Sequence, residues 1–243
     1  MSTPTVGFIY PDHAAEDDYP RAAALLGLAL PVAHIYGTDL HAIPELLDLG
    51  SPEKLSHGAS LLAVADPAAV VWACTSGSFV YGPEGARGQV DTLADAAGVP
   101  ASSTSFAFVE AARALGMRRV AVVASYPEEV ARLFVDFLAD AGIEVVSMSS
   151  AGIDTAAEVG TLTPDQVLTL AVTNDHADAQ ALLIPDTAMH TLEVLPTLEA
   201  ALGKPVLTAN QVTIWEGLRL AGVSAVATEL GALFADRRRH VDH

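Results

Sequence analysis

Apolar and polar positions follow one another in blocks along this chain. Short runs rich in valine, isoleucine and alanine, typical of buried parallel strands, alternate with longer segments that have the spacing of amphipathic helices. The predicted strands are 6–10, 33–36, 69–73, 99–103, 120–124, 143–148, 181–184 and 206–208. The predicted helices are 19–29, 51–65, 89–97, 106–115, 128–141, 163–172, 192–202 and 212–220. This alternation predicts an α/β fold with parallel sheets that helices cover.

The second half of the pattern repeats the first. A Tyr-Pro-Asp segment begins at Tyr10 and a Tyr-Pro-Glu segment at Tyr126, an offset of 116 (126 − 10). At nearly the same offset, 112 (186 − 74), the strand-end residue Cys74 matches Asp186. One interpretation is that such short similarities occur in any chain in which strands and helices alternate. The other, which we favour, predicts two similar lobes (1–105 with 216–243, and 106–215) with Cys74 and Asp186 on opposite walls of one cleft.

The strand at 69–73 runs into Cys-Thr-Ser-Gly-Ser, which begins at Cys74. Ligands of open α/β sheets bind at the carboxyl ends of the strands. A thiol there is a good catalyst if backbone N–H groups lower its pKa. It could add to an activated double bond, or move a proton at a carbon beside a carboxylate. The alternative is a buried, inert cysteine.

Carbon-acid chemistry beside a carboxylate produces an enediolate, which needs hydrogen-bond donors already in place. Thr75 and Ser76 on the first lobe and Tyr126 on the second are the expected donors, because all three stand at strand ends. Asp186 either caps a following helix or acts as an acid or base whose pKa a partly apolar cleft raises.

Weaker candidates surround these residues. Asp12 and His13 follow the first strand, and His190 follows Asp186. Asn210 either caps a helix or reaches a substrate carboxylate. No metal is expected, because Asp12, His13 and Asp186 lack a recognisable ligand spacing.

The amino-acid composition limits the classes of molecule that this protein is expected to bind. The net charge of −18 argues against nucleic acid, whose binding requires lysine and arginine. A hydrophobic fraction of 51% supports a sizeable core. The single cysteine and the lack of a signal peptide or membrane-length apolar run predict a cytoplasmic protein that does not bind membranes. A small-molecule carboxylate is the expected partner, and a homo-oligomer, a dimer, is the expected assembly.

Several segments together resemble the aspartate/glutamate racemase superfamily, in particular its maleate isomerase and arylmalonate decarboxylase branch. They are the Cys-Thr-Ser-Gly-Ser motif at Cys74, the turn at 98–100, the run 114–122, Tyr126 and the run 204–211. The resemblance implies two pseudo-symmetric α/β lobes around a central cleft, with no metal or organic cofactor. It also implies that Cys74 is the nucleophile of an isomerase, and that Thr75, Ser76 and Tyr126 hold a carboxylate.

The sequence departs from this pattern at three places. The superfamily carries a cysteine on each lobe, and the second falls where this chain has Asp186. The superfamily also carries an asparagine in the first loop, where this chain has Pro-Asp-His-Ala at 11–14. It carries a further asparagine near the middle of the chain, where Thr155 is the nearest match.

The sequence thus predicts a cofactor-independent isomerase of a small carboxylate or dicarboxylate, with maleate-type cis–trans isomerisation through Cys74 as the leading reaction. The alternatives are decarboxylation of a substituted malonate with Cys74 as proton donor, racemisation by Cys74 and Asp186, and a non-catalytic carboxylate-binding protein. The predicted catalytic residues are Cys74, Asp186 and Tyr126. The predicted substrate-binding residues are Thr75, Ser76, Asp12, His13, Thr155, Thr187 and Asn210.

Overall fold

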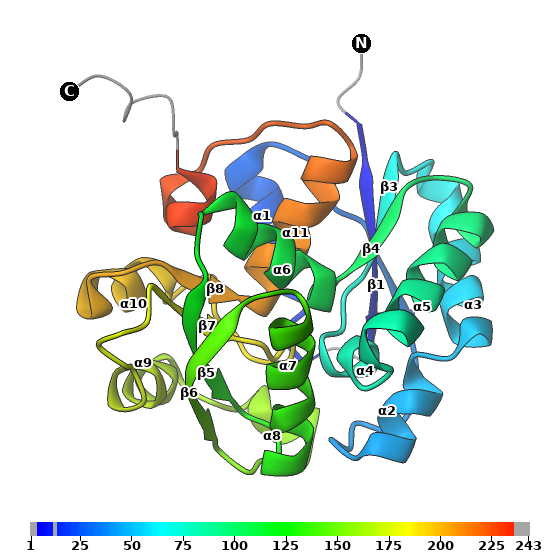
Figure 1. Ribbon diagram of the computed structural model, residues 1–243. Coiled ribbons are helices and arrows are strands. Elements are labelled where there is room, and N and C mark those ends of the chain that lie inside the picture. The colour runs from blue at the N-terminus through cyan, green and yellow to red at the C-terminus, as the bar shows by residue number, and fades with distance from the viewer. Residues whose placement is uncertain (1–3, 12–13, 236–243) are drawn as a thin grey trace.

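The computed structural model describes residues 4–11 and 14–235 and contains two four-stranded parallel sheets (Figure 1). The strands of the first sheet are β1 (Val6–Pro11), β2 (Val32–Ile35), β3 (Ala69–Trp72) and β4 (Ala101–Ser103). The strands of the second sheet are β5 (Arg119–Ala124), β6 (Glu144–Ser150), β7 (Ala181–Ile184) and β8 (Val206–Thr208).

The two sheets have the same topology. Their orders are β2-β1-β3-β4 and β6-β5-β7-β8, so the first strand of each sheet pairs with both its second and its third. β3, which ends next to Cys74, therefore corresponds to β7, which ends next to Asp186. The predicted α/β fold of two similar parallel-sheet lobes is confirmed.

Helices connect the strands. They are α1 (Asp18–Leu26), α2 (Ile43–Leu49), α3 (Pro52–Leu62), α4 (Ser76–Phe79), α5 (Gly82–Ala97), α6 (Thr104–Ala114), α7 (Glu128–Asp140), α8 (Ala156–Val159), α9 (Pro164–Thr173), α10 (Leu195–Leu202) and α11 (Ala209–Leu220), with short 3₁₀ turns at Ala63–Ala65, Thr228–Leu230 and Ala232–Phe234. Among the described helices, none is long and apolar enough to span a bilayer.

Apolar side chains cover both faces of β3, as expected for a central parallel strand. Val70 and Trp72 belong to one buried cluster together with Cys74, whereas Val71 belongs to the largest cluster of the molecule. That largest cluster also contains side chains of the second sheet, such as Val122. The two lobes therefore share one continuous core, which fixes the strand ends of one lobe against those of the other.

α11 follows the last strand of the second sheet but packs against the first. An added Cβ on Gly217 would lie 2.5 Å from Val6, so this glycine permits the close approach of α11 to β1. α6 and α11 lie side by side between the two sheets (Figure 1), and the hydroxyls of Thr104 and Thr213 are 2.6 Å apart. The lobe boundaries at 105 and 216 stay a prediction.

Three helix boundaries near the site differ from the sequence prediction. The sequence predicts no helix at α2 or at α4, and α5 begins at Gly82, seven residues before the predicted start at 89 (89 − 82). α4 is only four residues long, and its first three residues, Ser-Gly-Ser, are of types that favour turns. It is fully buried, so packing rather than propensity determines its conformation.

Candidate active site

A small cavity of about 40 Å³ lies where the carboxyl ends of β1, β3 and β7 meet. Cys74 lines it from the first lobe, and Asp186 lines it from the second. The loop 37–41, which follows β2, closes it from the first lobe, together with Leu46 and Leu49 of α2. The two strand-end residues that the sequence repeat paired therefore border the same cavity.

The Cys74 thiol is fixed by the turn that becomes α4. The Gly77 N–H donates to Sγ at 3.3 Å, and the Ser76 hydroxyl lies 3.9 Å away. The Gly77 carbonyl accepts a hydrogen bond from Gln89 at 2.8 Å. A Cβ on Gly77 would lie 3.1 Å from Sγ and 3.0 Å from the Trp72 ring, so a side chain there would displace the thiol.

Burial raises the pKa of Cys74 to about 12. The hydrogen bonds from Gly77 and Ser76 lower the pKa, but desolvation is the larger effect, and the nearby Asp186 carboxylate adds to it. The condition for a reactive thiolate at this strand end, a thiol pKa lowered by backbone N–H groups, is therefore not met, because the hydrogen bonds from Gly77 and Ser76 do not offset the loss of water. The thiol is neutral at physiological pH.

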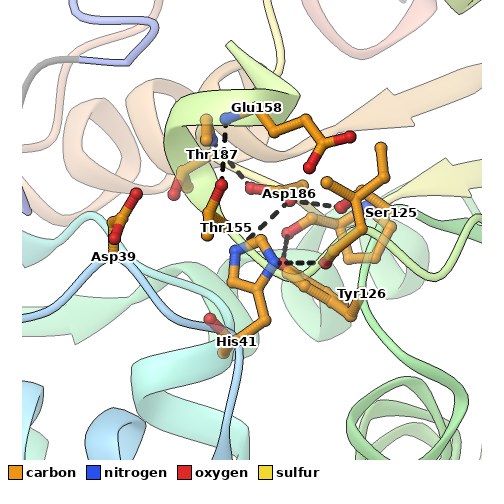
Figure 2. A network of polar contacts seen from close by, with 12 residues as sticks. Asp39, His41, Ser125, Tyr126, Thr155, Glu158, Asp186 and Thr187 are labelled. Atoms are coloured by element: carbon orange, nitrogen blue, oxygen red, sulfur yellow. Dashed lines mark hydrogen bonds and ion pairs between the residues drawn. The ribbon is translucent and has the colours of Figure 1, made fainter.

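The Asp186 carboxylate is held by three groups from three different segments. The Ala188 N–H donates to Oδ1 at 2.8 Å, and the Ser125 hydroxyl donates to Oδ2. His41 Nε2 lies 3.8 Å from the same Oδ2, and Figure 2 shows His41 and Ser125 both pointing at Asp186. A turn follows Asp186, and α10 begins only at Leu195. Asp186 is therefore not a helix cap.

Two tyrosines hold the backbone on either side of Asp186. The Tyr126 hydroxyl donates to the Pro185 carbonyl at 2.7 Å, and the Tyr10 hydroxyl donates to the Thr187 carbonyl at 2.6 Å. Burial raises the pKa of both phenols well above the ordinary value, so both remain protonated donors.

The hydroxyls of Thr75 and Ser76 lie beside the Tyr126 phenol and lower its pKa slightly against the larger effect of burial. Within the described part of the chain, Thr75 Oγ1 has no hydrogen-bond partner of good geometry. Buried hydroxyls are usually paired, so this one keeps unused hydrogen-bonding capacity next to Ser76, which lines the cavity.

Comparison with known proteins assigns the family. A family model described as arylmalonate decarboxylase matches residues 50–234. The chain belongs to the arylmalonate decarboxylase family. It is 30% identical over 240 residues to arylmalonate decarboxylase of Bordetella bronchiseptica, covering 93% of this chain and 94% of that one. A crystal structure of an arylmalonate decarboxylase mutant in the liganded form has a TM-score of 0.84 at 28% identity, covering 96% of this chain and 99% of that one.

Maleate isomerases are also similar to this member of the arylmalonate decarboxylase family. Maleate isomerase of Nocardia farcinica is 28% identical over 178 residues, 71% of each chain. A solved structure of Nocardia farcinica maleate cis-trans isomerase, a mutant with a covalently bound succinylcysteine intermediate, has a TM-score of 0.84 and 22% identity, covering 93% of this chain and 98% of that one. The resemblance to this branch is thus confirmed, and the chain is an enzyme of the branch that contains these decarboxylases and isomerases.

The other predicted binding residues have different surroundings in this family member. Asp12 and His13 lie outside the described residues. Thr187 lines the cavity. Thr155 caps α8, where its hydroxyl accepts from the Glu158 N–H at 3.2 Å.

Asn210 is fully buried and donates to Asp18 at 3.0 Å and to the Thr187 carbonyl at 3.1 Å. His190, a weaker candidate, pairs with Asp17 at 3.0 Å. Substrate contacts of Thr155, Thr187 and Asn210 stay predictions.

Sequence reasoning missed His41 and Ser125. Ser125 had a signal, because it directly follows β5 and precedes Tyr126. His41 had none, because it lies in a loop with no strand end or motif around it. The His41 backbone N–H donates to the Asp154 carbonyl at 2.7 Å, and the ring Nδ1 lies 3.0 Å from the Ile153 carbonyl oxygen. Asp154 and Ile153 both belong to the other lobe.

Proposed function

We propose that this enzyme decarboxylates malonates that carry one apolar substituent, with Cys74 as the proton donor. The observation that carries the proposal is the neutral Cys74 thiol, buried in an apolar cluster beside the Asp186 carboxylate. A proton donor must hold its proton until the carbanion forms, and a thiol whose ionisation is suppressed does so. A nucleophilic thiolate would require the opposite environment.

The cavity also favours a substrate with one bound carboxylate and one apolar side. Ser76 lines it on one side, and the Thr75 hydroxyl, which has no partner of good geometry among the described residues, and the Tyr126 phenol lie directly behind Ser76. Leu40, Leu46 and Leu49 line it elsewhere. A carboxylate placed against apolar side chains loses its hydration, whereas the neutral CO₂ that leaves has little hydration to lose.

The proposed reaction needs only groups of the protein and water. The bond between the α-carbon and the unbound carboxylate breaks, CO₂ leaves, and the electron pair stays on the substrate as an enediolate. Thr75 and Ser76 donate to the enediolate oxygens, and the Tyr126 hydroxyl turns from the Pro185 carbonyl to donate to them as well. The Cys74 S–H gives its proton to the α-carbon, and the resulting strongly basic thiolate takes a proton from water.

Substrate entry requires the site to open. A cavity of about 40 Å³ has room for little more than a water molecule. The loop 37–41 closes it, and three backbone contacts and one side-chain contact bind this loop to the second lobe. The backbone contacts are a Leu40–Thr155 bridge, the Ala156 N–H on the Asp39 carbonyl and the His41 N–H on the Asp154 carbonyl, and the Ala157 N–H donates to the Asp39 carboxylate. These contacts break and re-form as substrate enters and product leaves.

The test is a turnover assay with alkyl- and aryl-substituted malonates and with maleate. In D₂O we expect CO₂ release from a substituted malonate, with one deuterium incorporated at the α-carbon and the product formed as a single enantiomer. Cys74→Ser should lower kcat by orders of magnitude while the fold survives. A Cys74→Ser enzyme with near-normal kcat contradicts the proposal, as does failure to release CO₂ from every malonate tested.

Maleate-type isomerisation, the leading sequence prediction, is the second candidate. The observation in its favour is Asp186, a carboxylate near enough to Cys74 to act on its ionisation and to accept the thiol proton. Cys74 would then add to the double bond, the adduct would rotate about the resulting single bond, and elimination would return the thiolate. Formation of fumarate from maleate, with a cysteine adduct detected by mass spectrometry, would establish this reaction.

The homodimer and the cytoplasmic location stay predictions. Size-exclusion chromatography with light scattering tests the first, and fractionation of the source cells tests the second.

A further inference from the structure

We propose that His41 is a positioning residue for Asp186: protonated on Nε2, it forms an ion pair with Asp186 Oδ2 across 3.8 Å, so that a carboxylate substrate binds beside a neutral pair rather than a buried anion. The proposal rests on the proposed function only in requiring an anionic substrate. The observation that supports the proposal is the position of the two His41 ring nitrogens, of which Nδ1 faces a backbone carbonyl and Nε2 faces Asp186.

The two contacts of the His41 ring determine where its protons are. Nδ1 lies 3.0 Å from the Ile153 carbonyl oxygen, which can only accept, so Nδ1 carries a proton. In a neutral ring Nε2 would then be a bare acceptor. Nε2 instead faces Asp186 Oδ2 at 3.8 Å, also an acceptor when ionised. Two bare acceptors repel one another, so one further proton belongs to the pair, on Nε2 or on the carboxyl group.

The charges around the cavity explain why this proton matters. Among the described residues that line the cavity there is no lysine or arginine, whereas Asp39 and Asp186 both line it. Within residues 4–11 and 14–235, the groups that face His41 are Asp186, the phenol ring of Tyr126 at 4.9 Å in an edge arrangement, and the backbone of the second lobe. His41 is therefore the group placed to offset the Asp186 charge. The whole chain carries −18, which further opposes entry of an anion.

The pairing also depends on closure of the two lobes. His41 belongs to the loop 37–41 of the first lobe, whereas Asp186 follows β7 of the second (Figure 2). Both side chains are almost fully buried, with exposures of 5% and 4%. Burying a carboxylate is costly, and Ser125 and Ala188 of the second lobe offset only part of this cost with neutral donors, so Asp186 gains a cationic partner only when this loop is seated on the second lobe.

A double-mutant cycle on the full chain separates this role from simple packing. His41→Leu should raise KM for a substituted malonate by roughly tenfold or more, with a smaller change in kcat, because an unpaired carboxylate repels the substrate. Asp186→Asn removes the charge, so His41→Leu/Asp186→Asn should bring KM back toward the wild-type value. His57→Leu, an exposed histidine of α3, is the matched control. A double variant as impaired as His41→Leu would overturn the proposal.

A readout without turnover distinguishes failure of this proposal from failure of the proposed reaction. Calorimetric titration with malonate as the probe should show weaker binding to His41→Leu and recovery in the double variant, whether or not malonates are turned over. ¹⁵N NMR of histidine-labelled protein should show a proton on His41 Nδ1, and ¹³C NMR of labelled aspartate should locate the second proton. A bare Nε2 beside an ionised Asp186 carboxylate would refute the pairing.

Discussion

Tyr10 and Tyr126 occupy equivalent strand ends of the two lobes, and their hydroxyls hold the carbonyls on either side of Asp186. Tyr10 donates to Thr187, and Tyr126 donates to Pro185. The internal repeat therefore contributes to the site as well as to the fold, because equivalent tyrosines of the two lobes together fix the backbone around the Asp186 carboxylate. The two phenols differ in their second contact. Tyr10 also accepts from the Ala15 N–H at 3.1 Å, whereas Tyr126 lies beside Thr75 and Ser76.

This difference predicts separate effects for the two tyrosines. Tyr126→Phe should lower kcat by about 10²–10³, the usual cost of losing a donor at a developing oxyanion. Tyr10→Phe should lower the free energy of unfolding by about 1 kcal/mol, the net value of one hydrogen bond, with a smaller effect on kcat. Steady-state kinetics and urea unfolding measure both, and Tyr36→Phe, at an exposed position, is the control. Equal kinetic losses in both variants would mean that Tyr126 only supports the backbone.

Alkaline stability should report the burial of Cys74. Burial raises the pKa of the folded thiol to about 12, whereas an unfolded thiol ionises near its ordinary pKa of 9.0. The unfolded state therefore loses its proton first, and the contribution of this group to stability falls as pH rises between these values. At about pH 10.5 the loss should be on the order of 2 kcal/mol relative to about pH 8. The buried tyrosines add their own loss in both proteins, so urea unfolding should show a loss that is larger by this amount in the wild type than in Cys74→Ser.

Asp18 should make stability depend on pH in the acidic range. Burial raises the pKa of Asp18 to about 6 from 3.8, and the hydrogen bonds from Asn210 and Thr191 only partly oppose it. The folded state keeps the Asp18 proton to a higher pH than the unfolded state does. The contribution of this group to the free energy of unfolding is therefore fully present below pH 3.8 and is lost as pH rises through about 6. Asp18→Asn removes this dependence and should gain stability over the wild type from acidic to neutral pH. A constant difference between the two proteins would contradict the raised pKa.

Asp186→Asn distinguishes reactions that need one proton carrier from those that need two. Decarboxylation with protonation by Cys74 should keep most of its kcat, because CO₂ leaves without help from an acid. Inversion of the α-carbon of a carboxylate, which needs a second carrier opposite Cys74, should be abolished. Chiral chromatography of products and of resolved acids incubated in D₂O measures both, with Asp95→Asn on the surface of α5 as control. Full activity on every substrate would mean that Cys74 works alone.

The sequence by itself determined the elements whose stability is mainly a matter of apolar periodicity. β3, β5 and β7 appear where the apolar runs predict them, because a strand buried on both faces must be apolar throughout. The internal repeat placed Cys74 and Asp186 at equivalent strand ends, and both border one cavity. It also indicated Tyr126, since residues that follow parallel strands gather at one edge of the sheet.

Only the tertiary structure decided what acts on these side chains. His41 reaches Asp186 because the loop 37–41 is seated on residues more than a hundred positions away, and no local pattern encodes such a contact. The helical turn of α4 exists because burial overrides the turn preference of its glycine and serines. The protonation of Cys74 likewise depends on the packing that removes water from the thiol, which outweighs the hydrogen bonds that its own motif supplies.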